Sequence, residues 1–319
     1  MSWIGWQIDY LLLLQGFRDL SGHIFDNFFL TVTRFGEIAI PAIFMSFVYW
    51  CWNKKAGIYI IWSYMFGFIT NMFLKTTACI YRPWILDSRV VPLEQAFPAA
   101  TGYSFPSGHT AGAMTTWGST AVIFWKNKYV RYGCIGLILL VMFSRNYLGV
   151  HTPQDVIVSF GVCLFILFVV KRVLEWESEG KNRDLVLIGI ITLINILLLL
   201  YVNLKSYPMD YVNGQLLFNP CSVKTDSFAR IGTTMGIFYG WLLEKRFINF
   251  DPKIGNYLHK FIRGIVGFAV VYLFSTLGEN VFINYIGEKA GLFVDYFVIG
   301  LFITFIYPYA IKLSYGNNK

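Results

Sequence analysis

The sequence is dominated by long apolar runs separated by short charged segments. Hydrophobic residues make up 56% of the 319 residues and charged residues only 14%, whereas soluble domains carry roughly 25% charged residues. A transmembrane helix needs roughly 17–25 apolar residues to cross the hydrocarbon core. We therefore expect an all-α fold, a polytopic membrane helix bundle with about nine transmembrane helices. The candidate spans are 36–52, 57–74, 108–125, 132–148, 154–171, 185–204, 228–243, 264–278 and 291–311.

The charges of the connecting segments predict the orientation of this bundle. Lysine and arginine are enriched in cytoplasmic loops. With Lys54 and Lys55 on the cytoplasmic side, alternating spans place 16 of the 26 basic residues inside. This predicts an amino terminus outside and a carboxyl terminus in the cytoplasm. No basic helix or RNA-type aromatic motif accompanies the net charge of +8, so we expect no nucleic acid partner.

We expect one membrane domain with three parts. Residues 1–26 form an N-terminal segment, in which 3–17 is read as an amphipathic interfacial helix or, alternatively, as a tenth imperfect span. Residues 27–184 form a core, and 185–319 add further transmembrane helices. This last part contains three glycines spaced four residues apart, Gly232, Gly236 and Gly240. They predict a small-residue stripe for close helix packing rather than a functional site.

Three short segments at the ends of apolar runs carry most of the reactive residue types. They are Lys75-x6-Arg82-Pro83, Pro106-Ser107-Gly108-His109, and Ser144-Arg145-x5-His151-x3-Asp155. The predicted orientation, which was derived without these segments, brings all three to the outer face. Together they supply three cations, two histidines and one carboxylate.

This combination suits phosphoryl transfer without a metal ion. The reaction needs positive charge on the phosphoryl oxygens, an in-line nucleophile and a proton donor for the leaving oxygen. Lys75, Arg82 and Arg145 can supply the charge, and arginine has a planar fork suited to phosphate. Asp155 is the one acid within the three segments, so we expect no metal site and no cofactor.

The two histidines can divide the remaining work. Asp155 can accept a hydrogen bond from one ring nitrogen of His151 and leave the other free to attack phosphorus. His109 is then available as the general acid. Ser107 and Gly108 begin an apolar helix, where backbone N–H groups and the helix dipole favour an anion.

Each piece also has an ordinary structural explanation. Cations at helix ends are common interfacial anchors, and Ser107 can be a simple N-cap. Thr152-x-x-Asp155 resembles a capping box, with Pro153 at the first helical position. Capping does not require an arginine six residues before His151, so we favour a phosphate site for the whole set.

These segments resemble the type 2 phosphatidic acid phosphatase superfamily, whose three motifs they match in order. The resemblance implies that His151 is a nucleophile forming a phosphohistidine, that Asp155 orients it and that His109 protonates the leaving group. It also implies a phosphate-binding role for a further set: Lys75, Arg82, Ser107, Gly108 and Arg145. The nine-span layout is similar to the glucose 6-phosphatase and sphingosine-phosphate phosphatase branches.

We therefore expect an integral-membrane phosphomonoesterase that acts on the non-cytoplasmic face. A phosphorylated lipid is the expected substrate, with membrane lipids around the protein. Two alternatives remain: a sugar-phosphate phosphatase of the glucose 6-phosphatase type, and a non-catalytic transporter or lipid-binding protein. The absence of glycosylation sequons favours a bacterial plasma membrane over an organelle membrane with a lumenal site. The sequence does not indicate an oligomeric state.

Overall fold

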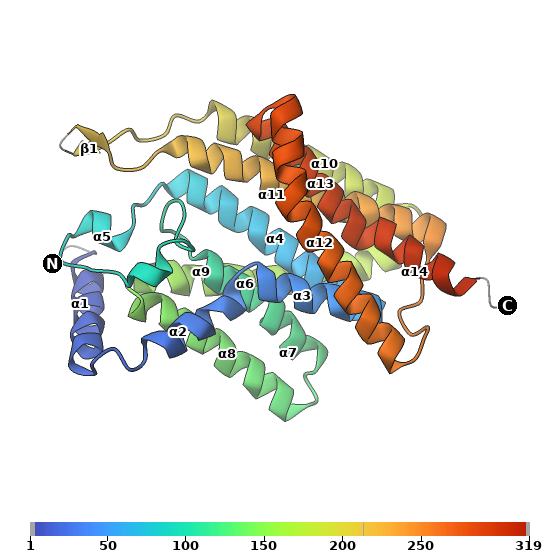
Figure 1. Ribbon diagram of the computed structural model, residues 1–319, viewed down its shortest axis with the longest axis horizontal. Helices are drawn as coiled ribbons and strands as arrows, with labels where there is room; N and C mark the ends of the chain where they lie inside the picture. The colour runs from blue at the N-terminus through green and yellow to red at the C-terminus, as the bar shows by residue number, and fades with distance from the viewer. Residues whose placement is uncertain (1–3, 213, 317–319) are drawn as a thin grey trace. The chain divides into compact units, whose positions relative to one another are not determined.

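The computed structural model describes residues 4–212 and 214–316 and is mainly helical (Figure 1). The one sheet among these residues is a two-stranded antiparallel hairpin, β1 (Tyr211–Val212) with β2 (Gln215–Leu216), in which Tyr211 is opposite Leu216. The helices fall into two compact units. Helices α3 (Ala39–Phe47), α4 (Lys54–Ala78) and α9 (Pro153–Ser178) contribute residues to both units.

The first unit contains residues up to 42, 62–170 and 207–220. Besides parts of α3, α4 and α9 and the hairpin, it holds these helices and turns: α1 (Gly5–Leu20), α2 (Asp26–Thr33), η1 (Arg34–Gly36), α5 (Pro83–Leu86), η3 (Glu94–Ala96), α6 (Gly108–Ala113), η4 (Met114–Gly118), α7 (Ser119–Ile123) and α8 (Lys128–Tyr147). Helix α2 packs along α8 (Figure 1). Phe29, Tyr147, Leu148 and Val150 share a buried cluster, which fixes the segment that leads into His151.

The second unit contains residues 43–61, 171–206 and 221–316. Its remaining elements are η2 (Val48–Trp52), α10 (Arg183–Leu204), α11 (Pro220–Leu243), η5 (Glu244–Ile248), α12 (Tyr257–Ile286), α13 (Glu288–Leu301), η6 (Phe302–Ile306) and α14 (Tyr307–Gly316). A Cβ added at Gly232 would collide with the backbone carbonyl of Phe293 in α13, and one added at Gly236 would collide with that of Phe297. The predicted glycine stripe is therefore confirmed as a site of close helix packing.

Charged side chains at the ends of several helices of the second unit pair with one another. Lys54 Nζ lies 2.7 Å from Glu244 Oε1, and Arg246 Nη2 lies 2.7 Å from Asp184 Oδ1. Glu177 pairs with Lys245 of the same unit. The distribution of lysine and arginine predicts that the basic members of this network lie on one side of the membrane. The contacts bring these helix ends together, while the side on which they lie stays a prediction.

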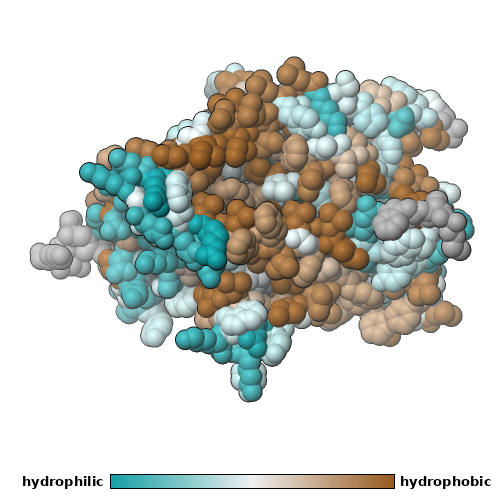
Figure 2. Space-filling view, turned by 180° about the vertical axis from the view of Figure 1, so that it is seen from behind, coloured by the Kyte–Doolittle hydropathy of each residue, from teal (hydrophilic) through white to brown (hydrophobic). Residues whose placement is uncertain are grey.

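The apolar surface agrees with a membrane protein. Large apolar side chains such as Leu193 and Leu197 of α10 are more than half exposed, and Figure 2 shows apolar residues over wide areas of the visible surface. Patches of that kind mark contact with lipid or with a partner. Five helical stretches of the described chain are long and apolar enough to cross a membrane: 54–86, 153–178, 183–204, 257–286 and 288–314.

A sixth span results if the pair Asp26–Gly36 and Ala39–Trp52, bent by 48°, is one broken helix. The nine predicted ranges are helical over nearly their whole length. Three of them, at 108–125, 132–148 and 228–243, are not among the candidate spans. The first is rich in hydroxyl side chains, including Thr115, Thr116 and Ser119, which lower its hydropathy. The expected count of nine is thus not confirmed.

The helix predicted at residues 3–17 is present in the structure over most of that range. Helix α1 covers Gly5–Leu20, and residue 3 of the predicted helix lies outside the described chain. Gln7 of α1 is buried and accepts a hydrogen bond from Gln154 N at 3.0 Å, so this helix packs on the start of α9. The interfacial role and the boundaries at residues 26 and 184 stay predictions.

Candidate active site

The turn between α8 and α9 fixes the spacing of Arg145 and His151. The backbone N–H groups of Val150 and His151 both donate to the Arg145 carbonyl, at 3.2 and 3.3 Å. Gly149 permits this reversal because its φ of 73° is left-handed, a region that glycine enters without a Cβ clash. The five residues between Arg145 and His151 therefore form a tight turn, which brings the last turn of α8 beside the start of α9.

His151 and Asp155 form a buried pair at the start of α9. Their side chains are 2% and 3% exposed, and His151 Nδ1 lies 3.1 Å from Asp155 Oδ2. The same oxygen accepts from Thr152 N at 2.9 Å and from Ser104 Oγ at 2.5 Å. The capping-box geometry and the His–Asp pair therefore coexist, because one carboxylate oxygen serves both.

Arg82 determines which nitrogen of His151 carries the proton. Its Nη1 lies 2.9 Å from His151 Nε2 and also donates to the Val150 carbonyl. Since a guanidinium has donors and no acceptor, Nε2 must be the unprotonated nitrogen and Nδ1 must donate to Asp155. Arg82 is itself held by the carbonyls of Thr101 and Gly102.

Lys75 and Arg145 reach the site from the last turns of α4 and α8. Lys75 Nζ donates to the carbonyl of Tyr103 at 2.5 Å. Arg145 is fully buried and donates from Nη1 to Thr33 Oγ1 at 2.7 Å. Its Nε and Nη2 are buried with no hydrogen-bond partner among the described residues. Buried donors of a charged group are costly to leave unpaired, so this guanidinium is suited to receiving an anion.

The Pro-Ser-Gly-His segment places His109 in the first turn of α6. Ser107 is the N-cap and its Oγ accepts from Thr110 N at 3.3 Å. Gly108 is exposed while its neighbours Ser107 and His109 are buried, so the segment opens to the surface at Gly108. His109 Nε2 lies 3.4 Å from Glu37 Oε1, at the end of the turn that follows η1.

The electrostatics join these parts into one site. Burial, and then the charges that surround it, lowers the pKa of His151 well below its usual value. The groups that act on it after burial are Arg82, Arg145, Lys75 and His109. His151 is therefore neutral at neutral pH, which is the state in which Nε2 has a free electron pair.

Three polar residues of this site were missed by sequence reasoning. Ser104 binds Asp155, Thr33 binds Arg145, and Glu37 faces His109. Ser104 lies three residues before Ser107, which was too weak a signal among hydroxyl residues. Thr33 and Glu37 lie far from the motifs in sequence, so only helix packing reveals them.

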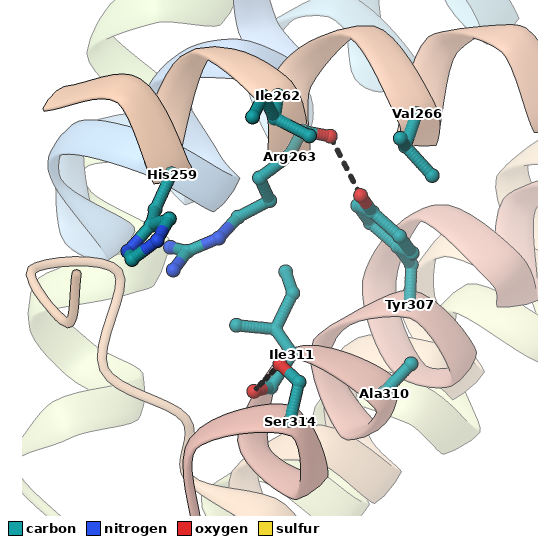
Figure 3. A pocket seen from close by; sticks show the side chains of 8 residues that line it. All are labelled: His259, Ile262, Arg263, Val266, Tyr307, Ala310, Ile311 and Ser314. Carbon is teal, nitrogen blue, oxygen red and sulfur yellow. Dashed lines mark hydrogen bonds between the residues drawn. The ribbon is translucent and has the colours of Figure 1, made fainter. Parts of the chain in front are cut away.

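A separate pocket lies within the second unit, and Figure 3 shows it. Its volume is about 310 Å³, and its lining is His259, Ile262, Arg263, Val266, Tyr307, Ala310, Ile311 and Ser314. Arg263 donates to three backbone carbonyls, and Tyr307 donates to the Arg263 carbonyl at 2.6 Å. These polar groups serve to hold helix ends, and none of the predicted site residues lines this pocket.

Comparison with known proteins gives two family matches along the chain. A PAP2 superfamily model matches residues 56–179, and a model of the PAP2 superfamily phosphatase transmembrane extension matches residues 228–316. The first match includes all three motif segments. No solved structure matches the chain.

Three curated relatives illustrate what the chain is similar to. Undecaprenyl-diphosphatase BcrC of Bacillus subtilis is 26% identical over 50% of this chain and 81% of its own. An undecaprenyl-diphosphatase of Sulfolobus acidocaldarius is 30% identical over 42% of this chain and 61% of its own. Lipid A 4'-phosphatase of Porphyromonas gingivalis is 24% identical over 52% of this chain and 75% of its own.

The described residues contain five or six candidate spans, and together with these matches they identify the chain as an integral membrane phosphatase. It belongs to the PAP2 superfamily. None of the three relatives is a glucose 6-phosphatase or a sphingosine-phosphate phosphatase, so the likeness to those branches stays a prediction.

Proposed function

We propose that the protein hydrolyses the phosphate monoester of a lipid through a phosphohistidine on His151, without a metal ion. The observation that carries the proposal is the guanidinium of Arg145, which is fully buried with two unpartnered donors and acts electrostatically on His151. A phosphoryl group beside His151 would accept from both donors. Arginine suits this role because its fork matches two phosphoryl oxygens.

The first half of the reaction forms an N–P bond and breaks an ester P–O bond. Nε2 of His151 attacks phosphorus, and the Nδ1 proton stays on the ring and is held by Asp155. The electron pair of the broken bond leaves on the lipid oxygen, which takes a proton from His109. Arg82 Nη1, which lies 2.9 Å from Nε2, transfers its hydrogen bond to a phosphoryl oxygen as the Nε2 lone pair becomes bonded.

The second half uses water and restores the enzyme. His109, now neutral, takes a proton from the water as its oxygen attacks phosphorus. The N–P bond breaks, inorganic phosphate leaves and His151 again has a free lone pair on Nε2. Lys75, Arg82 and Arg145 balance the phosphoryl charge throughout, while Ser107 and Gly108 shape the α6 end of the site.

A lipid substrate is favoured by where the reactive residues lie along the helices. Lys75 is in the last turn of α4 and Asp155 is in the first turn of α9, and both helices belong to candidate spans. Ends of spans lie at headgroup depth. The names of the relatives, undecaprenyl-diphosphatase and lipid A 4'-phosphatase, agree with a phosphorylated lipid.

We place the site on the non-cytoplasmic face of a bacterial plasma membrane, from the distribution of lysine and arginine. Intact cells should hydrolyse an added phosphate ester that cannot cross the membrane, at nearly the rate of lysed cells. Activity that emerges only on lysis would place the site in the cytoplasm and reverse the proposed orientation.

The catalytic proposal is tested by phosphate release from purified protein in EDTA. We expect undiminished turnover in EDTA, inhibition by vanadate and no turnover in His151→Ala. His23→Ala is the matched control, since His23 is half exposed and pairs with Asp26 of α2. A His151→Ala protein that keeps wild-type turnover would overturn the nucleophile, and loss of activity in EDTA would overturn metal independence.

The substrate class is tested separately with a panel. It contains phosphatidate, phosphatidylglycerol phosphate, polyprenyl diphosphate, a sphingoid phosphate and glucose 6-phosphate. We expect the highest kcat/KM for one of the lipids. A clear preference for the sugar phosphate would replace the lipid proposal by the soluble-substrate alternative.

A further inference from the structure

Glu37 is the one carboxylate within hydrogen-bonding distance of His109 among the described residues. Its Oε1 lies 3.4 Å from His109 Nε2, and its side chain is 35% exposed. Glu37 precedes residues 56–179, the region that matches the PAP2 family model. A residue outside the matched region thus faces His109, the last residue of the second motif segment.

The turn that carries Glu37 is locked against α6. A Cβ at Gly36 would collide with the carbonyl of His109, and a Cβ at Gly112 would collide with the carbonyl of Gly36. Trp117 Nε1 donates to the Phe35 carbonyl at 2.9 Å. Two glycines and one side-chain hydrogen bond therefore hold the two backbones in contact, so the position of Glu37 follows from packing.

The preceding residues of the same segment also reach the site. Thr33, at the end of α2, is the acceptor for Arg145 Nη1. The segment 33–37 therefore contacts both the phosphate-binding arginine and the second histidine. Such a pair of contacts is expected of a wall of the active site rather than of a chance surface approach.

The charges around His109 differ in sign. The charged or titratable groups that act on it are Glu37 from the turn after η1, Arg145 from α8 and Arg82 from the segment before α5, and His109 in turn acts on His151. Burial disfavours an imidazolium at His109 most strongly, and both arginines disfavour it as well. A carboxylate favours the imidazolium, and Glu37 supplies that carboxylate. Arg145 and Arg34 are the cations besides His109 that act on Glu37.

Resting on the proposed function, we propose that Glu37 is a positioning residue for the general acid. It holds one ring nitrogen of His109 and balances the charge of the imidazolium. The other ring nitrogen then delivers the proton to the leaving alkoxide and later takes one from water. Glu37 itself keeps no proton and forms no bond to substrate in this scheme.

The first test varies the leaving group. Protonation matters for a poor alkoxide leaving group and little for p-nitrophenolate, because general acid catalysis scales with the basicity of the oxygen. We expect Glu37→Gln to lower kcat/KM, which reports the steps up to the phosphohistidine, about tenfold on a short-chain alkyl phosphate. It should change kcat/KM on p-nitrophenyl phosphate by less than about threefold. Glu37→Asp keeps the charge and should recover part of the loss.

The second test measures the pH dependence of kcat. A general acid must be protonated, so activity falls as pH rises through its titration. Removing the carboxylate should move this alkaline limb to lower pH by about one unit in Glu37→Gln. Glu94→Gln is the matched control, because it makes the same change at an exposed turn of the first unit, and it should leave the limb in place.

A double variant separates this role from a structural one. In a His109→Asn background the acid is absent, so Glu37→Gln should cost less than about twofold more on the alkyl ester. A full tenfold loss in that background, or equal losses on both esters with an unmoved limb, would overturn the role of Glu37. If the wild-type protein releases no phosphate from any ester, the proposed function fails instead.

Discussion

Replacing Asp155 by asparagine is the sharpest test of the proposed nucleophile. Asp155 Oδ2 accepts from His151 Nδ1 at 3.1 Å, and this bond keeps the proton on Nδ1. As the Nε2–P bond forms, the imidazole gains positive charge beside the carboxylate. Asparagine is nearly the same size but neutral, so it removes the charge with little change in packing.

The expected cost follows from the geometry. Two unit charges about 4 Å apart interact by about 4 kcal/mol at an effective dielectric constant of about 20. This corresponds to about a thousandfold lower kcat. The amide can also present N–H to Nδ1, which would move the ring proton to Nε2 and block attack. We therefore expect kcat to fall by about a thousandfold or more, with a much smaller change in KM.

The assay is phosphate release by purified Asp155→Asn in detergent, with thermal unfolding measured in parallel. Asp26→Asn is the matched control: Asp26 is a buried carboxylate of the first unit that accepts from Tyr147 OH at 2.7 Å. It should lose stability while keeping kcat near that of wild type. A well-folded Asp155→Asn protein with kcat within tenfold of wild type would refute the charge argument.

Three further predictions concern pH, phosphate binding and packing. Because burial and the charge of Arg82 lower the pKa of His151, the unfolded chain binds a proton below about pH 6.5 that the folded protein rejects. The free energy of unfolding should therefore decrease as the pH drops below that value. In a series of Tm measurements against pH, His151→Gln should lose less Tm at low pH than the wild type, and an equal loss would contradict this prediction. Arg145→Lys keeps charge but loses the fork, so KM and the vanadate inhibition constant should rise about tenfold; unchanged constants would exclude Arg145 from binding. Gly236→Ala should lower Tm by several degrees, because an added Cβ would collide with a carbonyl of α13. Gly189→Ala should leave Tm unchanged, because an added Cβ there would lie in open space.

The sequence was sufficient to predict helices at nearly all of the expected ranges. Lipid leaves no water for the backbone, so an apolar run must satisfy its own polar groups by forming a helix. The number of spans was harder, because a helix such as Gly108–Ala113 with its continuation buries hydroxyl side chains among other helices. Hydropathy does not separate a polar helix inside a bundle from one outside the membrane.

The sequence likewise indicated which residues to examine for phosphate chemistry, since their types and spacing lie in three short segments. The turn at Gly149 and the single oxygen of Asp155 that serves both a cap and His151 are local features. Both lie within or beside the third motif segment, residues 144–155, although the turn at Gly149 was not itself predicted. Local spacing carries this information because one helical turn or one tight turn determines it.

Only the tertiary structure decided which distant groups complete the site. Thr33 and Glu37 meet Arg145 and His109 because α2 packs along α8 and because Gly36 fits against α6. Arg82 meets Nε2 of His151 across 69 residues of chain. These pairings depend on the shapes of whole helix faces, and a pattern of residues along one chain segment does not contain them.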